Sequence, residues 1–302
     1  MRLYAPRYYL DFACIADRCR HSCCVGWEID IDEQTLACYD RSDAPYAAHI
    51  RASIDRQGDA PHFCLTRGER CPHLDERGLC RIILHCGEGY LCDICREHPR
   101  FYHQTSRGME AGLGMACEEA ARIILTSDDY AEFVEIETLE GERELFDFDA
   151  VTERERAFAL LSQRDVAYVD RLHAISAAYG VLPNVRTDEQ WRQILSALEY
   201  LDEAHRQLLG CYSSDGATPR EWERVLERAL AYFLYRHASQ ATSADEWREA
   251  VGLALLCERL LASLIRATGA QEMAEVVELA RILSEEIEYS EENTQEIKEL
   301  FL

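Results

Sequence analysis

Cysteine is concentrated at one end of this chain. Of 14 cysteines in 302 residues, 12 lie within the first 117. The chain begins without an apolar segment and a small-residue cleavage site, so we expect a cytoplasmic protein whose thiols stay reduced. Clustered cysteines in a reducing compartment bind metal or carry out redox chemistry more often than they form disulfides. The cysteine-rich part is therefore predicted to bind metal.

The two parts of the chain differ in periodicity. Up to Cys117, turn sequences such as Asp75-Glu76-Arg77-Gly78 leave little room for long helices. Beyond it, apolar residues recur every 3.6 positions, which predicts amphipathic helices near 150–180, 188–211, 219–239, 244–268, 270–288 and 292–301. We predict a mainly α fold, with an irregular cysteine-rich metal-binding region over 1–125 and an acidic all-helical bundle over 126–302.

Charge separates the same two parts. The formal net charge is −24, and residues 1–117 carry 14 arginines and no lysine against 17 acidic residues. The rest of the chain carries 18 basic against 39 acidic residues. Because so acidic a surface repels phosphate backbones, we expect no nucleic-acid partner. No run of residues approaches the roughly 18 apolar positions of a membrane-spanning helix, so we expect no membrane partner either.

The cysteine spacings exclude several standard metal motifs. The chain offers a single Cys-x2-Cys hook, Cys92/Cys95, whereas a zinc ribbon needs two. The ferredoxin run Cys-x2-Cys-x2-Cys is absent. A Cys-x3-Cys-x2-Cys triad would begin at Cys19 and Cys23 but finds Gly26 in third place. What remains is four or more thiolates that converge from distant turns, a donor set that suits zinc, copper(I) or an iron–sulfur cluster.

The acidic part shows neither a Gly-rich strand-to-helix turn nor the other marks of a Rossmann-type nucleotide site. Its two cysteines, Cys211 and Cys257, are expected to be buried small apolar residues.

Several linked motifs carry a resemblance to a known family. They are Cys14-x4-Cys19-x3-Cys23-Cys24-x2-Trp27, Cys71-Pro72-x-Leu74 with Gly78-x-Cys80, Cys95-Arg96-x-His98-Pro99-Arg100, and Glu110-x-Gly112-Leu113-x4-Cys117-Glu118-Glu119-Ala120-Ala121-Arg122. In this order they resemble the flagellin lysine N-methylase family. The first motif also resembles a wider group of small cysteine-cluster proteins described as zinc- or iron-chelating.

This resemblance implies an S-adenosylmethionine-dependent methyltransferase that modifies surface lysines of flagellin in the bacterial cytoplasm before export. It also implies a cysteine-ligated iron–sulfur cluster, of the 4Fe–4S type, with zinc as the alternative. The family pattern leaves Cys38, Cys64, Cys86 and Cys92 outside the cluster. Carried over to this sequence, the cluster cysteines are Cys14, Cys19, Cys23, Cys24, Cys71, Cys80, Cys95 and Cys117.

Methyl transfer to lysine requires a neutral amine, which a nearby carboxylate would help to maintain. Asp30, Asp32 and Glu110 are candidates because they lie near the cysteines in sequence, and a turn or surface role is the alternative for each. Arg96 and Arg100 are candidates to hold a cofactor carboxylate or to pair with nearby acids. The sequence assigns neither a catalytic residue nor a methyl-donor site. A zinc- or iron-chelating protein without catalysis, or a metal-stapled interaction fold, stays an alternative.

Overall fold

The computed structural model describes residues 1–58, 60–141, 146–182, 186–217 and 219–301. The chain forms two compact units, a larger one from 1–12 and 101–302 and a smaller one from 13–100. Periodicity predicts a boundary near 125, whereas packing joins both 1–12 and 101–125 to the larger unit. The reason is strand pairing, since the first strand of the chain pairs with strands that follow residue 100.

A four-stranded sheet anchors the larger unit, in the order β4-β5-β1-β6. Strand β1 (Arg2–Pro6) pairs in parallel with β5 (Gly108–Leu113) and antiparallel with β6 (Phe133–Thr138). Strand β4 (Arg100–Thr105) lies beside β5 at one edge. Since β6 falls within 126–302, the prediction of an all-helical region is wrong there. Its residues, Phe-Val-Glu-Ile-Glu-Thr, alternate apolar and polar side chains as a strand with one covered face does.

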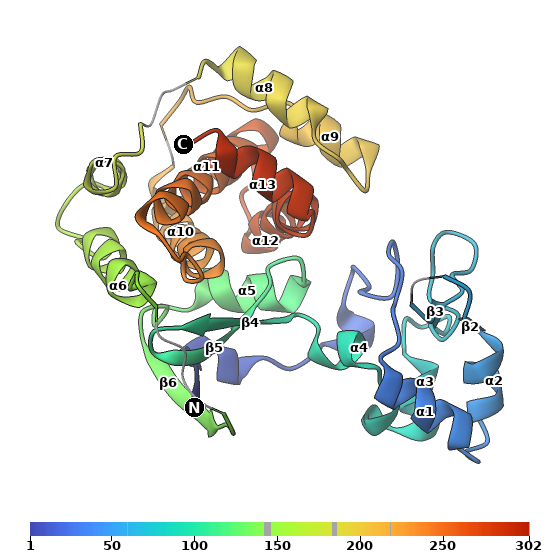
Figure 1. Cartoon of the computed structure of the whole chain (residues 1–302). Helices are drawn as coiled ribbons and strands as arrows, with labels where there is room; N and C mark the ends of the chain where they lie inside the picture. The colour runs from blue at the N-terminus through green and yellow to red at the C-terminus, as the bar shows by residue number, and fades with distance from the viewer. Residues whose placement is uncertain (59, 142–145, 183–185, 218, 302) are drawn as a thin grey trace. The chain divides into compact units, whose positions relative to one another are not determined.

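Helices make up most of the larger unit, so the prediction of a mainly α protein is confirmed (Figure 1). Helix α5 packs against α10 and α12, and α10 packs along α11. The helices are α5 (Glu118–Thr126), α6 (Ala150–Leu161), α7 (Tyr168–Ala178), α8 (Asp188–Ala197), α9 (Glu203–Leu209), α10 (Glu223–Ala238), α11 (Ala244–Thr268), α12 (Met273–Leu283) and α13 (Glu291–Glu299). Short 3-10 turns and a π-helical turn, Ser284–Glu288, complete the set. Among the described residues, no helix combines the length and apolar character needed to cross a membrane.

Helix ends follow their capping residues. Helix α11 spans the predicted range 244–268, because Ser243 accepts a hydrogen bond from the Glu246 amide and Gly269 adopts the left-handed conformation that ends it. The predicted helices over 150–180 and 188–211 are each divided into two. Short loops between α6 and α7 and between α8 and α9 make these divisions.

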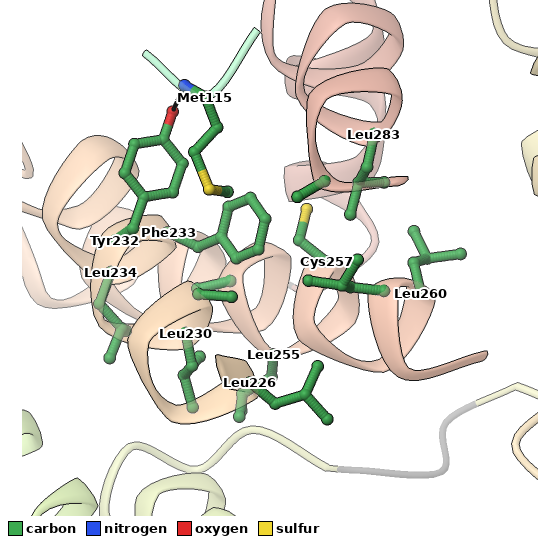
Figure 2. Close-up of a cluster of buried hydrophobic side chains, with 14 of the residues drawn as sticks. Met115, Leu226, Leu230, Tyr232, Phe233, Leu234, Leu255, Cys257, Leu260 and Leu283 are labelled. Atoms are coloured by element: carbon green, nitrogen blue, oxygen red, sulfur yellow. Dashed lines mark hydrogen bonds between the residues drawn. The ribbon is translucent and has the colours of Figure 1, made fainter. Parts of the chain in front are cut away.

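The core of the larger unit lies between α10, α11 and α12. Figure 2 shows its centre, where Phe233, Cys257 and Leu283 gather, and the Tyr232 hydroxyl accepts a hydrogen bond from the Met115 amide at 3.1 Å. Cys257 is fully buried, as the sequence predicts. Cys211 is exposed, so the same prediction is wrong for it, because it follows the end of α9 in a turn.

One buried carboxyl group makes folding sensitive to pH. Burial raises the pKa of Glu258 to about 7, and its side chain accepts a hydrogen bond from Tyr168 at 2.9 Å. The unfolded chain releases this proton near 4.5. Stability held by the protonated form is therefore complete below pH 4.5 and is lost as the pH rises through 7, by about 3 kcal/mol.

We expect Glu258→Gln to remove this dependence, because glutamine keeps an acceptor for Tyr168 and does not ionise. In urea unfolding at pH 8 the variant should be more stable than the wild type by up to about 3 kcal/mol, with a much smaller difference at pH 5. A difference that stays the same at both pH values would contradict the assignment.

The smaller unit has short elements and a small core. Its elements are α1 (Glu33–Arg41), α2 (Ala47–Ala52), β2 (Ile54–Asp55), β3 (His62–Phe63), α3 (Arg81–Cys86) and α4 (Asp93–Glu97). Strands β2 and β3 pair antiparallel. The buried core consists of Ile29, Ile31, Tyr39, Ile50, Phe63, Cys71, Ile82 and Cys92. Two of these eight are cysteines, so thiols form part of the packing itself.

Candidate metal centre

Backbone pairing brings the first two cysteine segments together in the smaller unit. The Cys71 amide donates to the Cys24 carbonyl at 2.8 Å, and the Gly26 amide donates to the Glu69 carbonyl at 3.0 Å. An antiparallel bridge joins Val25 and Arg70 between these bonds. Because Gly26 has a φ of +93°, the chain turns sharply after Cys24 at a position where a side chain would be strained. The Cys24 and Cys71 side chains consequently start from adjoining backbone.

A tight turn returns Cys80 to Cys71. The Asp75 carboxylate accepts from the amides of Arg77 and Leu79, each at 2.8 Å, and thereby closes the turn. Leu74 and Cys80 form a bridge on the returning strand. Cys80 is also the N-cap of α3, so the first helical amides lie beside its sulfur.

Asp75 holds the turn that positions Cys80, but it is not itself a proposed metal ligand. Asp75→Ala is expected to weaken metal binding by about 10- to 100-fold, the usual cost of losing a group that orients a ligand. Equilibrium competition with a chromogenic chelator measures this change. Glu76→Ala, at the exposed neighbouring position, is the control and should leave affinity unchanged. Equal affinities for the two variants would contradict the role given to Asp75.

The third cysteine segment is held at the start of α4. Cys92 is the N-cap of this helix, and Cys95 follows one turn later. Asp32 accepts from the amides of Thr35 at 2.8 Å and Asp93 at 2.9 Å, so one carboxylate caps α1 and fixes the beginning of α4. Burial opposes ionisation of Asp32, yet these backbone amides outweigh it and lower its pKa.

Two pairs of sulfur atoms share protons in this unit. Hydrogen bonds from the thiols of Cys23 and Cys71 lower the pKa of Cys24 to about 3, and donation to Cys24 raises the pKa of Cys71. Similarly, the Cys95 thiol lowers the pKa of Cys92, and donation to Cys92 raises the pKa of Cys95. In each pair one sulfur is thus favoured as the thiolate and the other as the thiol.

The sulfur of Cys80 lies close to both pairs. Burial raises the pKa of Cys80, and the negative charges of Cys24 and Cys92 add to this shift. The charges of Cys24 and Cys71 likewise raise the pKa of Cys95, so the two pairs interact electrostatically. We define the five-cysteine cluster as Cys24, Cys71, Cys80, Cys92 and Cys95.

The five-cysteine cluster has the donor chemistry of a soft-metal site. Several buried sulfur atoms compete for protons, and a cation that replaces those protons relieves the repulsion among thiolates. Thiolates of this kind suit zinc or an iron–sulfur cluster. His98 lies at the edge, with its ring 6.0 Å from that of Trp27. Burial lowers the pKa of His98 to about 4, so this imidazole is neutral.

The cluster differs in membership from the family pattern. Four of the predicted cysteines belong to it, and Cys92 is an addition that the pattern places outside. The sequence feature that indicates Cys92 as a member is its Cys-x2-Cys spacing with Cys95. Of the cysteines that the pattern places outside, Cys38 is half-buried and Cys64 is exposed.

The other predicted ligands occupy different positions. Cys23 is exposed, and its thiol donates to Cys24. The Cys14 sulfur accepts from the Ala16 amide at 3.4 Å, and the Cys19 thiol donates to the His21 carbonyl at 2.5 Å. Cys117 lies in the larger unit as the N-cap of α5. Whether Cys14, Cys19, Cys23 and Cys117 bind metal stays a prediction.

The candidate acids separate by environment. Asp32 is a helix cap, and Asp30 is exposed beside Glu28 and His62, a group whose donor atoms lie within 4.8 Å of one another. Glu110 is neither a turn nor a surface acid, because its side chain is fully buried in β5 and forms an ion pair with Arg154 at 2.6 Å.

The candidate arginines take structural positions. Arg96 pairs with Asp93 and with Glu97, the latter at 3.5 Å. Arg100 donates to the Arg96 carbonyl at 3.4 Å. Of the two roles expected for Arg96, the structure shows the pairing with nearby acids.

Comparisons with known proteins identify similar sequences. The lysine-N-methylases of Salmonella choleraesuis and Salmonella typhimurium are each 30% identical to this chain over 134 residues, which cover 41% of this chain and 32% of theirs. The flagellar biosynthetic protein FliU of Salmonella muenchen is 30% identical over 134 residues, which cover 77% of that protein. The chain thus spans about a third of the lysine-N-methylases it matches. No family model and no solved structure matches it.

Proposed function

The chain belongs to the family of the flagellar biosynthetic protein FliU, and from this premise we propose that it is a protein lysine N-methyltransferase. Its methyl donor is S-adenosylmethionine and its substrate is flagellin, modified in the bacterial cytoplasm before export. The observation that carries the proposal is the 30% identity shared with proteins named lysine-N-methylase and FliU.

The five-cysteine cluster holds the metal of this enzyme, which we propose to be an iron–sulfur cluster of the 4Fe–4S type. When bound, the metal centre supplies cross-links between segments that otherwise share a core of only eight buried residues. Cys24, Cys71, Cys80, Cys92 and Cys95 offer one thiolate more than a four-ligand centre needs. The acidic helical part draws the lysine-bearing substrate toward the enzyme, because residues 118–302 carry 39 acidic residues against 18 basic ones.

The direct test combines metal-loaded chain, purified flagellin and S-adenosylmethionine with a labelled methyl group. We expect the label on flagellin lysines, located by peptide mass spectrometry. S-Adenosylhomocysteine in place of the donor, and flagellin with acetylated lysines, are the controls. Absence of label on flagellin from protein with a full metal complement would overturn the proposal.

The acidic surface makes a separate prediction about substrate capture. At flagellin concentrations below KM, raising the salt concentration from 50 to 500 mM is expected to slow methylation by about tenfold or more, because screening weakens long-range attraction. The rate at saturating flagellin should change little. A rate below KM that is insensitive to salt would exclude electrostatic capture.

A second candidate function follows from the cluster itself, because its five cysteines all lie within 13–100. A protein that stores or delivers zinc or iron would need this set and no methyl donor. It would load and release metal reversibly and would show no affinity for S-adenosylmethionine. A purely structural metal staple predicts instead that chelation unfolds the smaller unit.

A further inference from the structure

The larger unit contains a cavity that neither the cysteine cluster nor the sequence motifs account for. Its volume is about 680 Å³, and helices α6, α7 and the start of α11 form its walls. Pockets for small-molecule ligands usually measure roughly 300 to 1,000 Å³. The cavity is therefore large enough for a nucleoside with an attached amino acid.

Aromatic side chains form the inner wall. The Trp247 ring lies 5.5 Å from that of Tyr179 and 6.2 Å from that of Phe148, at interplanar angles of 65° and 45°. The Tyr179 hydroxyl donates to the Glu153 carbonyl at 2.8 Å and so fixes its ring against α6. Aromatic faces stack on planar bases and attract organic cations. This wall suits a ligand that has both a planar base and an organic cation.

Charged groups of both signs form the outer wall. Glu153 pairs with Arg156 at 2.9 Å on α6, and Asp245 pairs with Arg248 at 3.2 Å on α11. The Arg156 and Asp245 side chains are 69% and 74% exposed, so both heads are accessible. A guanidinium binds a carboxylate, and a carboxylate binds an ammonium group. The outer wall is thus complementary to the zwitterionic end of an amino acid.

We propose that this cavity binds S-adenosylmethionine. This inference rests on the proposed function, since it names the place of the methyl donor. The adenine base and the sulfonium group contact Phe148, Tyr179 and Trp247, and the methionine carboxylate and ammonium meet the arginines and acids of the outer wall. A lysine side chain alone fits less well, because its ammonium can pair with the acids of the outer wall but offers no carboxylate to the guanidiniums of Arg156 and Arg248.

Two neighbouring alanines of α7 provide a matched test. Both are exposed, but only Ala178 lines the cavity, and Ala177 does not. Ala178→Trp should fill the cavity and raise the Kd for S-adenosylmethionine by at least about tenfold, whereas Ala177→Trp should leave it unchanged. Arg156→Ala, at the exposed rim, should also weaken binding. Isothermal titration calorimetry on the full metal-loaded chain measures each Kd, and circular dichroism checks that each variant folds.

The outcomes separate this inference from the proposed function. If the wild type and Ala178→Trp bind the donor equally and both methylate flagellin, the cavity assignment is wrong and the function stands. If the wild type does not bind S-adenosylmethionine at all, the assignment and the donor of the proposed function both fail. Weaker binding by Ala178→Trp and Arg156→Ala, with unchanged binding by Ala177→Trp, supports the assignment.

Discussion

The double substitution Cys92→Ala with Cys95→Ala is expected to remove the metal from the smaller unit and to unfold much of that unit. The Cys95 thiol donates to Cys92, and the charges of Cys24 and Cys71 raise its pKa, so these sulfur atoms lie close together. Loss of the pair leaves three of the five sulfur atoms, one fewer than a four-ligand centre needs. Binding of a structural metal contributes on the order of 10 kcal/mol to the folding of small domains, more than the net stability of about 3 to 5 kcal/mol that a core of this size supplies. Bound metal per chain should fall to below about a tenth of the wild-type value.

Metal analysis and hydrogen exchange over residues 13–100 measure the two effects. Cys64→Ala is the control within the same unit, because this cysteine is exposed and lies outside the cluster. Cys257→Ala is the control for a buried cysteine, and it should destabilise the larger unit without loss of metal. Full metal content and unchanged exchange in the double variant would show that the five-cysteine cluster is not the metal centre.

Arg154→Met is expected to destabilise the larger unit by about 3 to 5 kcal/mol, because it leaves the buried Glu110 carboxylate with only the guanidinium of Arg107, at 4.0 Å. Arg154 donates to both carboxylate oxygens of Glu110, at 2.6 and 3.0 Å, and to the Ser239 hydroxyl at 2.7 Å. Its guanidinium also lies 4.3 Å from the centre of the Phe133 ring. All the donors and acceptors of this pair lie away from water, since both side chains are fully buried.

Urea unfolding of three variants tests this account of the buried pair. The double variant Arg154→Met with Glu110→Met should recover most of the lost stability, because no charge is then left uncompensated. Arg122→Met, which breaks the exposed i,i+3 pair with Glu119, should cost less than about 1 kcal/mol. A double variant that is as unstable as Arg154→Met would show that packing, and not the unpaired charge, sets the cost.

Much of the helical part could be predicted from the sequence, because the signals there are local. Ser243 and Gly269 mark the ends of α11, and the Thr187–Gln190 capping box starts α8. The strand β6 was missed because a six-residue alternation is a weak signal beside long helical periodicity. Its pairing with β1 depends on residues more than 100 positions away.

The candidate sites were predictable only in part. The sequence indicated a convergent set of thiolates, and four of the eight proposed ligands meet in the five-cysteine cluster. The family pattern places Cys92 outside the cluster, whereas its local Cys-x2-Cys spacing with Cys95 favours a shared site. The cavity beside Trp247 has no motif, since its walls come from segments that lie up to 100 residues apart. Glu110 appeared to be a surface acid because its partner, Arg154, is also distant in sequence.

The most direct test of the metal centre is the iron, acid-labile sulfide and zinc content of protein purified without oxygen, together with its visible absorption spectrum. The account predicts iron and sulfide in near-equal amounts, about four of each per chain, and little zinc. Zinc without sulfide would contradict the iron–sulfur assignment and favour the chelating or structural protein. No metal of any kind would contradict the metal centre itself.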